Sequence, residues 1–351
     1  MPKSSEYPLR SLYLYLSGSC NLSCRHCWIE PASDDKMLFP DLEDLKNAIS
    51  GARSLGLKSV KLTGGEPLLV PYFFELADWL AAEGIAFSVE TNGTLLTTPA
   101  VSRLKAAGAG KISVSIDAPS AGYHDILRGK RGAFEAARKG LLNAAAENMI
   151  TEVVFSLWKK NLSLLRESVL FAAKSGASFF KINILAEYRR ASLMREKGEL
   201  PGIREVLDLR DSARRSARES GIPVYMDLPP AFLLPSEVFA KGFCSIKNIL
   251  GITSGGNFSL CGIGELKSGF CFGSISENNI AEVWREAPLL REVREKLPGS
   301  LKGVCARCFY RDLCMGKCRG VSLAVSGDIY SAFPFCSDAM KEGLFPDSLV
   351  I

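Results

Sequence analysis

The chain of 351 residues is poor in histidine and in long apolar segments, and each shortage excludes a class of protein. It contains 2 histidines, which argues against histidine-based acid–base catalysis and against His-rich metal sites. No apolar run reaches the ~18 residues that a membrane-spanning helix needs. The N-terminus also lacks a long apolar core followed by a small-residue cleavage site. We therefore expect a cytoplasmic protein that does not interact with a membrane.

The composition excludes further structural classes. Hydrophobic residues make up 47% of the chain and charged residues 23%, and no low-complexity tract is present, so disordered, collagenous and coiled-coil proteins are set aside. The formal net charge of +5 is only mildly basic, and lysines and arginines on solvated helix faces account for it without a nucleic-acid partner. At about 150 residues per domain, this length predicts about two domains.

Cysteine, by contrast, is abundant. The chain has 11 cysteines, three of them between residues 20 and 27 and eight between 244 and 336. Without an export signal, so many thiols argue against a disulfide scaffold, and clustered cysteines in a cytosolic chain more often bind metal. The sequence therefore predicts metal centres in two separate regions.

The first two thirds of the chain alternates short β-rich runs with longer amphipathic runs. Strands are predicted at Leu12–Ser17, Lys58–Leu62, Ile85–Glu90, Lys111–Asp117, Thr151–Leu157 and Ser178–Ile184. Helices are predicted near residues 42–55, 71–83, 99–107, 132–147, 162–175 and 203–219. Repeated strand–helix units imply parallel strands joined by right-handed crossovers. An open doubly wound sheet and a partial barrel both fit this α/β pattern.

The character of the chain changes around residues 221–235, where a proline-rich stretch indicates a last strand and a linker. We therefore predict an N-terminal domain over residues 1–228 and a C-terminal domain over 229–351. The second region has short loops, many glycines and one clear helix near Ile280–Lys296. So small a region, with little apolar periodicity, is expected to need metal to hold its fold.

The first cysteine group, Cys20, Cys24 and Cys27, has the spacing C-x3-C-x2-C and follows the first predicted strand. A closed tetrahedral metal site needs four ligands. A four-iron cluster held by three cysteines leaves one iron open, where chemistry can take place. The alternative is a structural zinc site completed by His26 or by a distant cysteine.

Four further motifs follow the next strands in order. They are Gly64-Gly65-Glu66-Pro67, Thr91-Asn92-Gly93-Thr94, Ser113-Val114-Ser115-Ile116-Asp117 and His124-Asp125-Ile126-Leu127-Arg128-Gly129. Together with C-N-L-S-C-R-H-C-W at residues 20–28, this order resembles the radical S-adenosylmethionine (radical SAM) enzymes. The resemblance implies a partial (β/α)6 TIM-like barrel, in which active sites form at the C-terminal ends of the strands.

The resemblance also implies a binding site for SAM. The open iron would chelate the amino and carboxylate groups of its methionine moiety. The backbone of Gly64 and Gly65 and the carboxylate of Glu66 are expected to receive the ammonium group. Ser115 and Arg128 are expected to hold the carboxylate, because arginine offers a forked donor. In this family, cleavage of SAM yields a 5′-deoxyadenosyl radical that removes a hydrogen atom from an unactivated C–H bond.

Asn92 and Asp117 are expected to orient the ribose of SAM. Ordinary hydrogen bonding at strand ends and turns is the alternative for both residues and for Ser115, and a surface ion pair is the alternative for Arg128. His26 lies between two cluster ligands and is interpreted as a loop residue. Trp28 is expected to shield the cluster or to pack on adenine, with plain packing as the alternative.

The second cysteine group resembles the SPASM extension of radical SAM enzymes that modify peptides and proteins. It has the spacing C-x2-C-x5-C-x3-C from 305 to 318, with Gly256-x4-Cys261 upstream. The resemblance implies a small irregular domain with two auxiliary [4Fe–4S] clusters, and therefore three clusters in all. The first would be held by Cys244, Cys261, Cys271 and Cys318, and the second by Cys305, Cys308, Cys314 and Cys336.

Cys271 is the weakest of these ligands, because it lies outside the seven-cysteine core motif. If it is free, the first auxiliary cluster has an open iron that could bind substrate. Two structural zinc or rubredoxin-like iron sites are the alternative reading of the eight cysteines.

The predicted reaction is a two-electron oxidation of a ribosomally made peptide, forming a thioether or a carbon–carbon crosslink, because two extra redox centres could accept the second electron. Expected partners are the peptide and an electron donor such as ferredoxin or flavodoxin. Only 19 residues precede Cys20 and 15 follow Cys336, so recognition of a leader peptide is expected to fall to the core or to a separate protein.

Three other functions stay open. A sulfatase-type formylglycine maturase is disfavoured because Gly262 stands where those enzymes carry an acidic residue. A haem-pathway radical SAM enzyme is a second alternative. A non-catalytic iron–sulfur electron carrier is the third, although it would not explain the motifs at the strand ends. No general base is assigned, but several polar residues should face the cleft: Glu187, Tyr188, Arg189, Arg190 and Asp227.

Overall fold

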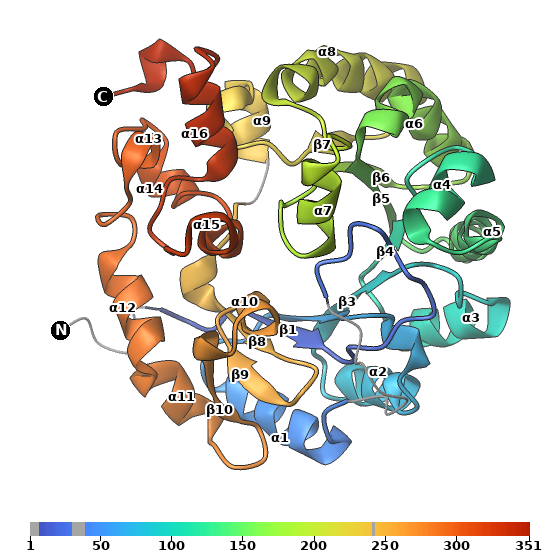
Figure 1. The fold of residues 1–351 in the computed structure, drawn as a ribbon. Coiled ribbons are helices and arrows are strands. Elements are labelled where there is room, and N and C mark those ends of the chain that lie inside the picture. The colour runs from blue at the N-terminus through green and yellow to red at the C-terminus, as the bar shows by residue number, and fades with distance from the viewer. Residues whose placement is uncertain (1–6, 30–38, 241–242) are drawn as a thin grey trace.

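The computed structural model describes residues 7–29, 39–240 and 243–351, and its centre is one mixed sheet (Figure 1). Along this sheet the strands lie in the order β10-β9-β8-β1-β2-β3-β4-β5-β6-β7. The seven strands of the N-terminal part are all parallel. They are β1 (Ser11–Tyr15), β2 (Ser59–Thr63), β3 (Ala86–Thr91), β4 (Lys111–Ser115), β5 (Thr151–Leu157), β6 (Phe179–Ile184) and β7 (Val224–Met226). The expected α/β fold with successive parallel strands is confirmed.

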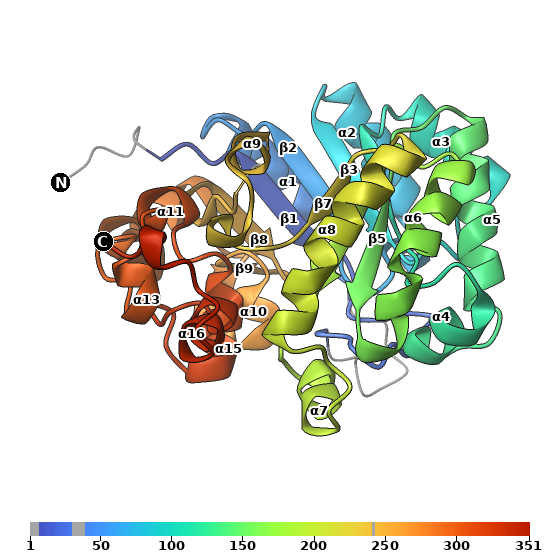
Figure 2. The same ribbon diagram turned by 90° about the horizontal axis from the view of Figure 1, so that it is seen from above.

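The helices that join these strands lie outside the curved sheet, as Figure 2 shows for α5, α6 and α8. They are α1 (Leu42–Arg53), α2 (Phe73–Ala82), α3 (Thr98–Ala106), α4 (Ala121–Arg128), α5 (Ala133–Ala146), α6 (Leu165–Lys174), α7 (Arg190–Glu196) and α8 (Ile203–Ser220). All six predicted helices of this region are present. The sequence analysis missed α4 and α7, which are short and follow strands directly.

Alternation along the strands separates an apolar outer face from a polar inner one. In β2, Val60 and Leu62 are buried in the core between sheet and helices, and Lys61 between them has its ammonium 2.8 Å from Glu90 of β3. In β6, Ile182 is fully buried in this core, whereas Lys181 lines a cavity on the other face. The interior of the partial barrel is therefore polar and open to a ligand.

The C-terminal part continues the same sheet instead of forming a separate one. β8 (Ile249–Ile252) pairs in parallel with β1, and β9 (Asn257–Ser259) and β10 (Cys271–Ser274) follow in antiparallel order. The sequence analysis missed these three strands. They connect the region after residue 228 directly to the first strand of the chain.

The rest of the C-terminal part consists of short helices, which gather on the side of the molecule opposite α5 and α6 (Figure 2). They are α9 (Pro235–Ala240), α10 (Ile263–Leu266), α11 (Ile280–Glu286), α12 (Pro288–Lys296), α13 (Gly303–Ala306), α14 (Arg311–Cys314), α15 (Arg319–Ser326) and α16 (Pro334–Lys341). The single helix predicted near Ile280–Lys296 is two helices. Pro288 lacks a backbone N–H and begins the second one.

Short 3₁₀ helices complete the fold. They span Pro67–Leu69, Lys159–Leu164, Pro230–Phe232, Ile246–Asn248, Ser268–Phe270 and Asp347–Leu349. Across the described ranges, none of the helices combines the length and the apolar character needed to cross a bilayer.

The packing of α5 against the loop after β3 generates a stability prediction. A Cβ atom at Gly140 would lie 2.3 Å from the carbonyl oxygen of Gly93 and 2.9 Å from Cβ of Leu96, whereas a Cβ at Gly122 in α4 meets no atom within 4 Å. Gly140→Ala should therefore lower the free energy of unfolding by about 1–3 kcal/mol. Gly122→Ala should leave it unchanged or slightly raised. Thermal unfolding of the two anaerobically purified variants checks this, and equal midpoints would contradict the contact.

Candidate active site

A cavity of about 470 Å³ opens at the carboxyl ends of the parallel strands. Cys20, Cys24 and Cys27 line one side of it, in the loop that follows β1. The other side is lined by residues that follow β6 and β7 and by residues in and next to the C-terminal helices, among them Cys318. The cavity therefore lies between the first cysteine group and one member of the second.

The cysteine loop is held by the end of α4. Ser23 and Arg25 donate their backbone N–H groups to the carbonyl oxygens of Arg128 and Leu127 at 3.2 and 2.8 Å. Gly129 ends the helix with φ +68°, and a Cβ there would lie 2.3 Å from the carbonyl oxygen of Ser23. The motif from His124 to Gly129 therefore anchors the loop, and only glycine fits its last position.

Burial governs the protonation of the loop thiols. It raises the pKa of Cys20 to about 11 and also raises the pKa of Cys27. Metal coordination deprotonates such a thiol outright. Three thiols that share one wall of a cavity fit the three-cysteine donor set expected for an open cluster.

Gly64 and Gly65 let the loop after β2 pack directly on the segment that leads into the cysteine loop. Gly65 N–H donates to the carbonyl oxygen of Ser17 at 2.6 Å, and Glu66 N–H donates to that of Ser19 at 2.9 Å. A Cβ at Gly65 would lie 2.1 Å from the Ser19 carbonyl oxygen. Both glycines line the cavity, as expected for a backbone that receives a ligand.

The Glu66 side chain lies behind the cavity wall. It is fully buried and accepts hydrogen bonds from the Leu68 N–H at 3.2 Å, the Thr91 hydroxyl at 2.7 Å and the Asn92 N–H at 2.8 Å. Burial raises its pKa to about 7, although these donors favour the charged form. The carboxylate ties the end of β2 to the end of β3. The predicted role of Gly64, Gly65 and Glu66 toward the ammonium group stays a prediction, in which the two glycines, unlike the Glu66 side chain, line the cavity.

Asn92 lines the cavity and contacts the cysteine loop. Its Nδ2 donates to Oδ1 of Asn21 at 2.8 Å and to the Cys20 sulfur at 3.6 Å, and its Oδ1 accepts from the backbone and hydroxyl of Thr94. These bonds place the side chain against a predicted cluster ligand. Its predicted role toward ribose stays a prediction.

Arg128 and Asp117 form a buried ion pair, with 2.6 Å between Nε and Oδ2. Burial by itself would raise the pKa of Asp117, but the guanidinium outweighs it and lowers that pKa. The other carboxylate oxygen accepts from the Ser156 N–H at 2.9 Å, and Nη1 of Arg128 lies 3.9 Å from the Cys24 sulfur. Arg128 and Ser115 line the cavity, whereas Asp117 supports Arg128 from behind.

The two residues beside the last loop cysteine have different surroundings. His26 lines the cavity, and burial followed by the nearby Arg128 charge lowers its pKa to about 4, so it is neutral near pH 7. Trp28 packs edge-on against Tyr15 with 5.5 Å between ring centroids. A Cβ at Gly262 would lie 2.2 Å from the Tyr15 hydroxyl oxygen. Two aromatic rings thus occupy the space next to Gly262.

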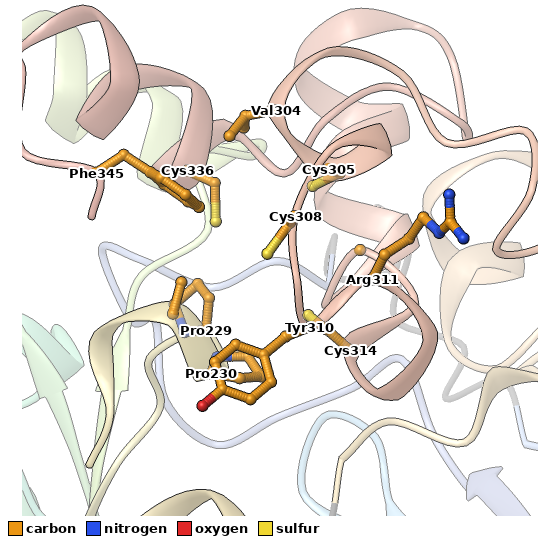
Figure 3. A pocket seen from close by; sticks show the side chains of 12 residues that line it. Pro229, Pro230, Val304, Cys305, Cys308, Tyr310, Arg311, Cys314, Cys336 and Phe345 are labelled. Atoms are coloured by element: carbon orange, nitrogen blue, oxygen red, sulfur yellow. The ribbon is translucent and has the colours of Figure 1, made fainter. Parts of the chain in front are cut away.

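Four cysteines of the second group surround one pocket, and Figure 3 shows their sulfur atoms directed into it. A hydrogen bond from Cys336 lowers the pKa of Cys305 to about 6. Pro229, Pro230 and Phe345 give the pocket an apolar wall. The donor set fits the predicted second auxiliary cluster, whose four expected ligands are Cys305, Cys308, Cys314 and Cys336.

The first auxiliary group is less complete. The charges of Cys261 and Cys318 both act on the Cys244 thiol, so these three thiols lie close to one another, and Cys244 and Cys318 are exposed. The Cys271 sulfur lies against Gly264, 4.0 Å from its carbonyl oxygen. The contact places Cys271 beside α10, and its part as fourth ligand stays a prediction.

In the described part of the chain, no three His, Cys, Asp or Glu side chains converge closely enough to hold one metal ion. The zinc alternative and the predicted clusters are therefore compared below through the families that the chain matches.

Sequence reasoning correctly placed some cleft residues and missed others. Glu187, Arg190 and Asp227 line the cavity, whereas Tyr188 and Arg189, which were also expected to face it, are not among its lining residues. Glu90 and Lys181 line it as well and were not singled out. Both could have been found in the sequence, because each is a charged residue at an inward position of an otherwise apolar strand.

Comparison with known proteins gives two matches along the chain. The profile of the Radical SAM superfamily matches residues 14–158, and that of the SPASM iron–sulfur cluster-binding domain matches residues 244–309. The chain belongs to the radical SAM superfamily. Within it, this chain is a member with a C-terminal SPASM domain.

Three relatives extend over most of the chain. An AdoMet-dependent heme synthase of Methanosarcina barkeri is 29% identical and covers 92% of this chain and 94% of its own length. An Fe-coproporphyrin III synthase of the same organism is 25% identical, with 92% and 86% covered. The mycofactocin maturase MftC of Mycobacterium tuberculosis is 25% identical, with 93% and 82% covered.

A solved structure shares the fold. Streptococcus suis SuiB bound to precursor peptide SuiA superposes with a TM-score of 0.76 at 18% identity, covering 94% of this chain and 76% of SuiB. At this identity the likeness establishes the architecture alone, and it confirms the radical SAM barrel with a SPASM domain.

The buried Asp117–Arg128 pair generates a second stability prediction. Asp117→Asn leaves the Arg128 charge buried without compensation and should cost about 3 kcal/mol or more. The matched control is Asp78→Asn, which removes an exposed partner 2.7 Å from Arg103 and should cost at most about 1 kcal/mol. Denaturant unfolding measures both, and equal losses would show that the buried pair does not hold the loop.

Proposed function

We propose that this enzyme removes a hydrogen atom from a side chain of a carboxylate-bearing tetrapyrrole. The observation that carries the proposal is a cavity with an apolar wall and a surplus of positive charge, beside the predicted SAM site. The heme synthase and Fe-coproporphyrin III synthase relatives, each matching over 92% of the chain, support it.

The apolar wall suits the face of a macrocycle. Ile203 and Val206 from α8, Val321 and Val325 from α15 and Phe335 from α16 line the cavity opposite the cysteine loop. An apolar ring gains free energy by leaving water for such a surface. These residues come from both parts of the chain, so the substrate would lie between the barrel and the SPASM domain.

The charge of the cavity suits carboxylates. Five basic side chains line it against four acidic ones, and the neutral His26 adds nothing. A buried carboxylate requires a paired cation. The basic side chains are Arg128, Lys181, Arg190, Arg195 and Lys317, and the acidic ones are Glu90, Glu187, Asp227 and Asp338.

The reaction also needs a SAM molecule that is held still and kept dry. When bound, the N-terminal cluster supplies the electron that cleaves SAM. The Gly64–Gly65 backbone, Ser115 and Arg128 would orient its methionine end, as their places on the cavity wall allow. Trp28, packed against Tyr15, would shield this end from water.

Three [4Fe–4S] clusters predict about twelve irons per chain. Cys24→Ala should lower the iron content to about eight and abolish SAM cleavage, because only the N-terminal centre binds SAM. Cys308→Ala is the matched control, which should lose the same amount of iron yet still cleave SAM. Iron assay and 5′-deoxyadenosine formation with dithionite measure the two effects. Intact SAM with the wild-type protein would instead indicate an electron carrier.

The substrate class is tested by anaerobic incubation of reconstituted enzyme, dithionite, SAM and Fe-coproporphyrin III deuterated on its side chains. The expected result is deuterium in 5′-deoxyadenosine and a tetrapyrrole of changed mass, because the abstracted atom moves from substrate to the radical. Unlabelled 5′-deoxyadenosine with unchanged tetrapyrrole would contradict the proposal.

A peptide maturase is the second candidate, supported by MftC at 25% identity over 93% of the chain. In this case the product of two-electron oxidation, a thioether or carbon–carbon crosslink, would be two mass units lighter than the peptide encoded beside the gene. The same assay with that peptide distinguishes the two. A ferredoxin or flavodoxin donor and a separate leader-recognition protein belong to this proposal.

A further inference from the structure

The floor of the cavity carries a layer of charged side chains that the radical chemistry itself does not require. Lys61 of β2, Glu90 of β3 and Lys181 of β6 all extend from the inner face of the barrel. The Lys61 ammonium lies 2.8 Å from Oε1 of Glu90 and 4.4 Å from the ring centroid of Tyr13. The Thr63 hydroxyl donates to Oε2 of Glu90 at 3.1 Å.

Two cations therefore lie near one carboxylate, but only Lys61 is paired with it. Burial by itself would raise the pKa of Glu90, but the charges of Lys61 and then Lys181 outweigh it and lower the pKa to about 2. Glu90 is thus a fixed negative charge that is already bound to Lys61. Within residues 7–29, 39–240 and 243–351, no carboxylate oxygen lies within ion-pair distance of the Lys181 ammonium. The floor holds one uncompensated positive charge.

Other cations of the cavity are already engaged. Arg128 is paired with Asp117, Arg195 with Glu187, and Lys317 with Asp227 at 2.6 Å. Arg190 donates to the carbonyl oxygen of Cys24 at 3.1 Å, on the cysteine loop. Among the described cavity residues, Lys181 and Arg190 are therefore the cations without a carboxylate partner, and Lys181 is the one that extends from the barrel strands.

The position of Lys181 also fits a ligand. In the register of the sheet it lies between Val154 of β5 and Tyr225 of β7, and Asn183, two residues further along the same face, lines the cavity too. An anion that reaches the floor would find an ammonium group and, next to it, a neutral amide donor.

We propose that Lys181 binds a carboxylate of the substrate, with the Lys61–Glu90 pair fixing its surroundings. That this carboxylate belongs to a tetrapyrrole rests on the proposed function. Lys181 is a binding residue in this scheme, and no electron or proton passes through it.

The test is a titration of the cluster-loaded enzyme with Fe-coproporphyrin III, followed by the change in Soret absorbance. Lys181→Met should weaken binding about 10- to 100-fold, the range expected when a hydrogen bond to a charged group is lost. Lys181→Arg should restore most of the affinity. Lys174→Met, on the exposed side of α6, is the matched control and should bind as wild type does.

The variant is expected to fold, because Glu90 keeps Lys61 as its partner when Lys181 is removed. Cleavage of SAM by Lys181→Met in the absence of substrate verifies that the cysteine loop is intact. The tetra-amide of the same porphyrin carries no carboxylate, so wild type and Lys181→Met should bind it equally.

The outcomes separate the two proposals. If the wild type binds Fe-coproporphyrin III and Lys181→Met binds it equally well, the role of Lys181 is overturned and the substrate class stands. If Lys181→Met binds both Fe-coproporphyrin III and its tetra-amide more weakly than the wild type does, Lys181 shapes the cavity and does not recognise charge. This result also overturns the proposed role of Lys181. If the wild type does not bind the porphyrin, the proposed function fails.

Discussion

The site depends on the buried ion pair between Arg128 and Asp117. This pair fixes the last residue of α4, and the final carbonyl groups of α4 in turn hold the backbone of the cysteine loop. The same guanidinium lies beside the Cys24 sulfur. One interaction therefore positions a cluster ligand, a cavity wall and a helix end together, because a buried charge with a single partner permits little movement.

A second constraint is close backbone approach. The loop after β2 hydrogen-bonds to the segment before the cysteine loop through groups that only glycine allows to come so near. Glu66 then connects β2 to β3 from behind, and Asn92 connects β3 to Cys20. These contacts join the loops at the carboxyl ends of β1, β2 and β3. Two of the side chains expected to bind SAM, those of Glu66 and Asp117, are buried behind the residues that line the cavity.

Much of the fold was predictable from the sequence, because short β-rich runs mark the parallel strands and helix periodicity marks the outer layer. The cysteine spacings likewise predicted iron–sulfur clusters, which the two matched domains support, whereas the number of three stays a prediction. The orientation of Glu66 was not predictable, since burial of a carboxylate depends on donors from three other positions. The strands β8 to β10 were also missed: they are three or four residues long, and glycine interrupts two of them. The role of Lys181 was not predictable either, because it depends on Glu90 and Lys61, which other strands bring close to it.

The pairing of β8 with β1 has a consequence for how the protein is made. β1 is synthesised long before β8, so one of its two neighbours in the sheet is missing until residue 249 has been made. Until then an unpaired strand edge is exposed, and such edges recruit other chains. Contacts this distant in sequence also form slowly. Truncation after the barrel would leave that edge of β1 permanently uncovered, so the C-terminal part completes the sheet as well as supplying cysteines.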